Sequence, residues 1–106
     1  MKRVFTLALF VFATLTFFSA NLQASIITGK NFYTTILEKP CGFSCDVMAK
    51  QHTSSEWKAL YETGKLKYTL KTLCPKAPFI DSEKDLTNLF DFLKTFSSDS
   101  GNTPSC

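Results

Sequence analysis

The fold is decided by one segment, SEKDLTNLFDFLKTF, which spans residues 82–96. Apolar side chains recur in it at helical spacing, with Phe92 on the flank of a stripe made by Leu86, Leu89, Phe90, Leu93 and Phe96. Ser82 stands three residues before Asp85, which is the spacing of a helix N-cap, and Lys94 lies late, as the helix dipole favours. The segment therefore predicts an amphipathic helix with one buried face.

A second helix is predicted upstream by Thr53-Ser54-Ser55-Glu56, which has the spacing of a capping box. Trp57, Leu60 and Tyr61 then share one apolar face, and Gly64 is a natural end for the helix.

Residues 65–74 are ambiguous, because Leu66, Leu70, Leu73 and Cys74 follow helical spacing while Leu66, Tyr68 and Leu70 also alternate as in a strand. We favour the helix, since its period accounts for more positions, and we expect the following prolines to end it.

Residues 25–39 have no clean period, although Phe32, Tyr33, Ile36 and Leu37 fit a short helix that ends at Lys39. The β-branched residues 34–36 weaken this helix. Pro40 suits the first turn of a helix, so we expect a new helix to run from Pro40 towards Gln51.

These elements predict an all-α fold, a compact array of three to five short helices stapled by disulfides. We expect a helical domain over residues 25–98 and an irregular tail over 99–106, pinned back by Cys106. The predicted core consists of Trp57, Leu60, Tyr61, Leu66, Leu70, Leu73, Leu86, Leu89, Phe90, Leu93 and Phe96.

Residues 1–24 have the layout of a signal peptide: a cationic start, an apolar run and small residues at Ala20 and Ala24, either of which suits cleavage. The alternative is an uncleaved membrane anchor. No later long apolar stretch follows, so we expect no stable membrane insertion after cleavage. Lysine outnumbers arginine eleven to one, which is typical of an AT-rich bacterial genome, so we expect the periplasm of a Gram-negative bacterium, with secretion as the alternative.

All four cysteines lie after the signal segment, and an even number in an exported chain is typical of a disulfide framework. Cβ atoms four residues apart on a helix are about 5–6 Å from each other, too far for a bond between Cys41 and Cys45. Each should reach outward instead. We favour Cys45 with Cys74 and Cys41 with Cys106, the exchanged pairing being nearly as good, and a break at Gly42 would permit a bond between Cys41 and Cys45.

One possible metal site is a stripe of Cys41, Cys45, Met48 and His52, which would share a face if this stretch were one helix. Thiol, thioether and imidazole groups suit a soft metal such as Cu(I). The same spacing also describes an ordinary buried helix face, with Met48 filling the core.

The cysteine pair, the Trp-containing middle helix and the segment from Asp81 through Phe96 together resemble small class I c-type cytochromes. The sequence departs from the C-x-x-C-H motif of that family, because three residues separate Cys41 from Cys45 and Asp46 stands where the haem-ligating histidine would be. The resemblance implies a helical exported domain, derived from a cytochrome that lost its haem.

The remaining sequence patterns argue against nucleic-acid binding and against enzymatic activity. Residues 25–106 contain ten lysines and nine acids, a net charge of +1 that gives little support to nucleic-acid binding. The acids are dispersed and the single histidine has no catalytic companions, so we expect no enzyme. Lys65, Lys67 and Lys71 form a modest basic face near Tyr68, which we interpret as solvated surface.

We therefore expect a non-enzymatic, exported binding or accessory module without a cofactor, whose partner is a protein or a surface of the cell envelope. The alternative is a carrier of haem or of a soft metal such as copper, related to c-type cytochromes.

Overall fold

The computed structural model describes residues 21–106, and the chain is helical there, with no strand in that range. The helices are residues 21–32, the π-helix η1 Tyr33–Leu37, α2 Glu38–Cys41, α3 Cys45–Ala49, α4 Ser54–Glu62, α5 Leu66–Leu73 and α6 Glu83–Thr95. The predicted all-α, disulfide-stapled fold is confirmed. The predicted signal peptide lies outside the described residues except for 21–24, which are helical.

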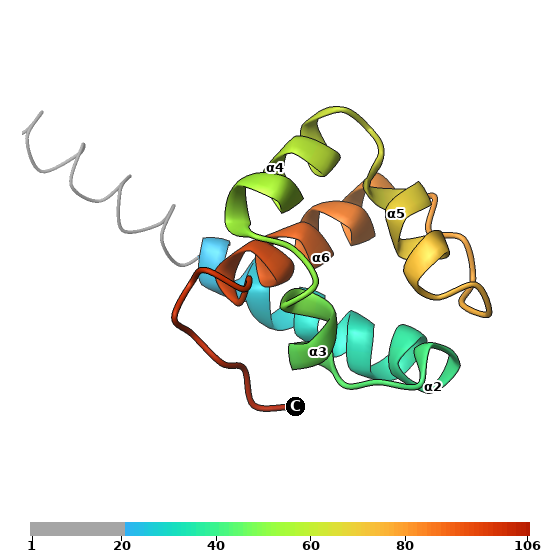
Figure 1. The fold of residues 1–106 in the computed structure, drawn as a ribbon, viewed down its shortest axis with the longest axis horizontal. Helices are drawn as coiled ribbons and strands as arrows, with labels where there is room; N and C mark the ends of the chain where they lie inside the picture. Colours follow the sequence, from blue (N-terminus) through green and yellow to red (C-terminus); the bar gives the residue numbers. More distant parts are fainter. Residues whose placement is uncertain (1–20) are drawn as a thin grey trace, which may run out of the picture.

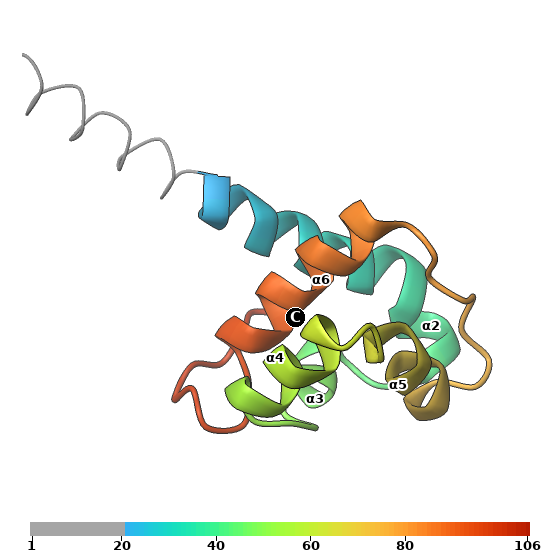
Figure 2. The same cartoon turned by 90° about the horizontal axis from the view of Figure 1, so that it is seen from above.

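The helix α6 is the centre of the fold and lies between the first helix and α4 (Figures 1 and 2). The first helix comes so close that a Cβ added at Gly29 would lie 2.0 Å from the carbonyl oxygen of Asn88 and 3.0 Å from Cβ of Phe92. Only glycine permits this approach, because any larger residue would push the two helices apart.

Two predicted N-caps fix the starts of α4 and α6. The Thr53 side chain accepts a hydrogen bond from the Glu56 amide, and the Glu56 carboxylate accepts one from the Thr53 amide, a complete capping box. The Ser82 hydroxyl accepts from the Asp85 amide at the start of α6. Gly64, with φ of 73°, follows α4 as expected.

The N-terminal half differs from the prediction at Pro40, which lies inside α2 and does not begin a helix. The helical stretch continues through Pro40 to Cys41, because the preceding π-turn shifts the backbone pairing before the residue that lacks an N–H. The predicted helix from 40 to 51 is wrong: Gly42, with φ of 80°, ends α2, and α3 begins at Cys45.

The core contains or borders every residue predicted for it. Six of those residues are buried, and Leu60, Tyr61, Leu73, Phe90 and Phe96 pack against the core while partly buried. The N-terminal half adds Tyr33, Leu37 and Ala49 to the core, none of which was predicted to be buried. Met48 is also buried, in agreement with its interpretation as a core-filling residue. Phe92, expected on the flank of α6, is fully buried because it faces the first helix near Gly29.

The tail after α6 is irregular, as predicted, and is held at several points. The Lys50 ammonium donates to the carbonyl oxygens of Phe96 and Ser97, at 2.9 Å and 3.2 Å, and to that of Asn102. The Ser98 amide donates to the His52 carbonyl oxygen at 3.1 Å. Lys50 thus neutralises the carboxyl end of α6 and orders the chain beyond it.

Candidate functional site

All four cysteines are paired, in the bonds Cys41–Cys74 and Cys45–Cys106. The Cα atoms are 4.8 Å and 5.8 Å apart, within the ordinary range for a disulfide. Two such bonds indicate an oxidising compartment outside the cytosol.

The prediction that Cys41 and Cys45 reach outward is confirmed, but the favoured pairing is wrong and the exchanged pairing is present. The reason is the turn at Gly42, which the helical spacing argument did not include. Cys41 closes α2 and meets the residue that caps α5, whereas Cys45 opens α3 and is buried against the tail.

The four residues predicted as a possible metal site do not form one stripe, because the helix that would align them is interrupted before Cys45. Cys41 and Cys45 are in different disulfides and offer no thiolate. Met48 is fully buried, and the His52 ring lies edge-on to Trp57 at 4.7 Å between centroids. Residues 21–106 contain no cluster of three or more His, Cys, Asp or Glu side chains placed for a metal ion.

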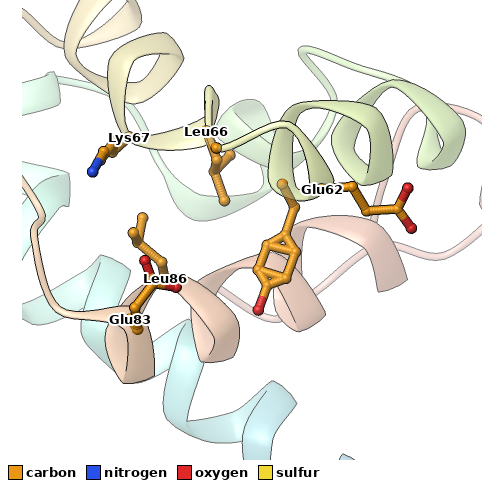
Figure 3. Close-up of a pocket in the computed structure, with 7 residues that line it drawn as sticks. Glu62, Leu66, Lys67, Glu83 and Leu86 are labelled. Carbon is orange, nitrogen blue, oxygen red and sulfur yellow. The ribbon is translucent and has the colours of Figure 1, made fainter.

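A cavity of about 330 Å³ lies where α4, α5 and α6 meet (Figure 3). Leu66 and Leu86 give it an apolar wall, and Lys67 and Glu83 lie on one side. Figure 3 shows the Glu62 carboxylate on the other side, pointing away from them. The two acids are thus apart, and the cavity lacks the paired carboxylates that general acid and base catalysis uses.

Beyond this cavity, two exposed aromatic side chains lie next to each other, a contact that the sequence did not predict. Tyr68 on α5 and Phe79 in the following loop are 59% and 47% exposed, and their ring centroids are 5.7 Å apart. We call Tyr68 and Phe79 the aromatic pair, and residues 63–80, which carry it, the α5 lobe.

Lys67 joins the cavity to the aromatic pair. Its ammonium nitrogen lies 5.6 Å from the centroid of Tyr68 and 5.9 Å from that of Phe79, within the range of cation–π attraction. The same nitrogen is 3.9 Å from a carboxylate oxygen of Asp81. A single lysine therefore orients both rings and ties them to the start of the segment that leads into α6.

Comparison of the chain with protein-family models, with curated proteins and with solved structures finds no match. The likeness to c-type cytochromes stays a resemblance of three parts of the sequence.

The carboxylates with altered pKa values all serve the fold. The Ser44 hydroxyl lowers the pKa of Asp46, the Thr53 amide lowers that of Glu56, and the Ser54 amide lowers that of Asp99. Each of these groups is at or near the start of α3 or α4, where a negative charge is stabilised. The lowered pKa values of Glu56 and Asp99 thus follow from hydrogen bonds to amides at the start of α4, and that of Asp46 follows from its bond with the Ser44 hydroxyl.

Tyr33 is the other group with a shifted pKa. Burial raises the pKa of its phenol, which donates a hydrogen bond of 2.7 Å to the Phe43 carbonyl oxygen. This contact fixes the turn between α2 and α3, so Tyr33 holds the two disulfide-bearing elements in place and has no access to a substrate.

Within residues 21–106, no helix combines the length and the apolar character needed to span a bilayer.

Proposed function

We propose that this protein is a non-enzymatic binding module of the cell envelope, exported to the periplasm, and that the α5 lobe is its binding surface. The observation that carries the proposal is the exposed aromatic pair. Two adjacent rings held by Lys67 expose apolar area to water, and a partner that covers this area gains the free energy of burying it.

The reactive residue types in the rest of the described chain favour a binding role over catalysis. The cysteines are cross-linked and the only histidine lies edge-on to Trp57. Of the three carboxylates with lowered pKa values, Glu56 and Asp99 accept hydrogen bonds from amides at the start of α4, and Asp46 accepts one from the Ser44 hydroxyl. Tyrosine is also among the residues that contribute most binding energy in protein interfaces.

Site-specific photo-crosslinking in the producing cells tests the proposal. A photoreactive phenylalanine analogue replaces Tyr68 in one variant and Val47, which is 41% exposed on α3, in the matched control. We expect an adduct of defined mass at position 68 that is absent at position 47. Equal labelling at both positions, or no adduct at either, contradicts a binding role for the lobe.

The haem or copper carrier is tested by a separate measurement on protein purified without reductant. The binding module has no reactive thiol and no Soret band. Two titratable thiols with stoichiometric copper, or a Soret band, would overturn the proposal in favour of a carrier.

A further inference from the structure

The α5 lobe differs from the rest of the molecule in charge. Residues 63–80 contain four lysines and no acid, whereas the other residues from 25 onward contain six lysines and nine acids. Lys65, Lys71 and Lys76 are exposed, and no ion pair joins them to an acidic side chain in the described part of the chain. The molecule therefore has one basic end and an acidic remainder.

The lysines and the aromatic pair are presented together. Leu66, Leu70 and Leu73 turn one side of α5 towards the core, which leaves the other side to lysines and Tyr68. Lys65 and Lys71 stand three residues before and after Tyr68, so both flank its ring on the exposed side. The ammonium of Lys71 donates to the Ala77 carbonyl oxygen at 2.6 Å, which ties the loop carrying Phe79 to α5.

This basic surface lies at one end of the molecule. Figures 1 and 2 both place α5 and the loop after it opposite the beginning of the described helix at Asn21, with α2 alongside. Lys39 of α2 and Lys76 of the loop line the same hollow beside the Cys41–Cys74 bond. The disulfide thus places Lys39 of α2, with its neighbour Glu38, beside the basic end.

The kind of cation on this surface indicates the kind of partner. The chain has no arginine after Arg3, and arginine is the residue that protein interfaces prefer for matching carboxylates in fixed geometry. Lysine is a point charge on a flexible stem, which suits a fluid layer of anionic headgroups. Exposed aromatic rings beside lysines are also typical of surfaces that rest at the lipid–water boundary.

We propose that the α5 lobe docks on anionic phospholipid, with its lysines against the headgroups and Tyr68 and Phe79 entering the interface. This inference rests on the proposed function and names the partner of the same surface. In this arrangement the lobe rests on the bilayer, and no helix of residues 21–106 is inserted.

The experiment measures co-sedimentation of the purified, oxidised protein with vesicles. Vesicles of phosphatidylglycerol and phosphatidylcholine in equal amounts should bind the protein, and vesicles of phosphatidylcholine alone should not. Binding should be lost in about 1 M salt, where the screening length falls to about 3 Å.

Matched variants locate the contact. Lys65→Gln with Lys76→Gln should weaken vesicle binding by about 10- to 30-fold, because each lysine near an anionic surface contributes a factor of about five. Lys58→Gln with Lys94→Gln removes the same charge from exposed positions on α4 and at the far end of α6 and should change binding less than about twofold.

A second pair of variants tests the rings. Tyr68→Ser with Phe79→Ser should reduce binding, while Ile27→Ser with Val47→Ser, at exposed apolar positions elsewhere, should leave it unchanged. Far-UV circular dichroism confirms that each variant is folded, so that a loss of binding reports the surface.

Equal binding to neutral and anionic vesicles, or equal loss in the lobe variants and their controls, overturns the inference. If the vesicles do not bind and crosslinking at position 68 yields a protein adduct, the lipid partner is wrong and the binding function stands. If neither vesicles nor crosslinking gives a signal, both proposals fail.

Discussion

Trp57 and Tyr68 belong to two regions of the molecule that use aromatic residues in opposite ways. Trp57 is fully buried in the helical body, residues 21–62 and 81–106, and its indole N–H donates to the Ala49 carbonyl oxygen at 3.0 Å. Tyr68 in the α5 lobe is 59% exposed beside Phe79. The aromatic side chain of Trp57 is therefore part of the core of the body, whereas those of Tyr68 and Phe79 are exposed to solvent on the lobe.

The two regions are also held differently. The body is closed by the approach of Gly29 to α6 and by the Lys50 contacts to the tail, both of which involve backbone atoms at short range. The lobe is joined to the first helical stretch by the Cys41–Cys74 bond. Buried side chains such as Leu66 and Leu70 also pack the inner side of the lobe into the core, so the disulfide adds to packing there, and the two regions differ in what their outer sides expose.

The largest effect should come from substituting the two aromatic residues in turn. Trp57→Ala should lower the free energy of unfolding by about 3–5 kcal/mol, since it leaves a cavity and removes a buried hydrogen bond. Tyr68→Ala should change it by less than about 0.5 kcal/mol, as is usual for surface positions. Urea denaturation followed by circular dichroism measures both. Similar losses in the two variants would show that Tyr68 contributes to packing as Trp57 does.

A somewhat smaller effect is expected from removing either disulfide by a double cysteine-to-serine change. Each should cost about 2–4 kcal/mol, with the bond of sequence separation 61 costing slightly more than the bond of separation 33. The part of the chain that is loosened in each variant distinguishes the lobe from the body. Hydrogen exchange should accelerate in α5 without Cys41–Cys74, and in residues 97–106 without Cys45–Cys106. Uniform acceleration in both variants would contradict a separately tethered lobe.

The smallest effect concerns pH and is confined to the body. Asp46, Glu56 and Asp99 have lowered pKa values, so their stabilising contribution is present above the ordinary carboxyl range and is lost as pH falls through the lowered values. The Tm should therefore decrease from about pH 5 towards pH 2. Asp99→Asn should have a lower Tm than the unaltered protein at pH 7, and the gap should close in acid. A gap of the same size at both pH values would show that Asp99 acts through its shape alone.

The helices α4 and α6 were predictable because their signals are local. A capping hydroxyl, an acid three residues later and an apolar stripe all lie within one segment, and the structure has both helices at the predicted places. Only the predicted buried face of α6 was incomplete, because it did not include Phe92. Phe92 is buried because a second helix covers that flank, and the periodicity of one helix cannot show how many neighbours it has.

The region around Pro40 was not predictable in the same way. A proline after β-branched residues indicates a boundary, yet here the π-helix η1 lets the helix pass through it. The end of the helix is set two residues later by Gly42. That displacement also decided the disulfides, because it turned Cys41 towards Cys74 and left Cys45 for the tail.

The candidate binding surface combines a predictable part with an unpredictable one. The lysines around Tyr68 are visible in the sequence, because they share the exposed side of one helix. Phe79 follows two prolines in a loop without a period, and its place beside Tyr68 depends on Lys67 and on the Lys71 bond to the loop. Sequence spacing gives no signal for such a contact.

The interleaved order of the two disulfides has a consequence for survival among proteases. Cys45 lies inside the loop closed by Cys41 and Cys74, and Cys106 lies outside it. A single peptide-bond cleavage anywhere between Cys41 and Cys106 therefore leaves both fragments covalently joined. The exposed lysines of the α5 lobe all fall within that interval. If a trypsin-like protease cleaves after one of them, the protein gains the mass of one water molecule, and no fragment is released until the disulfides are reduced.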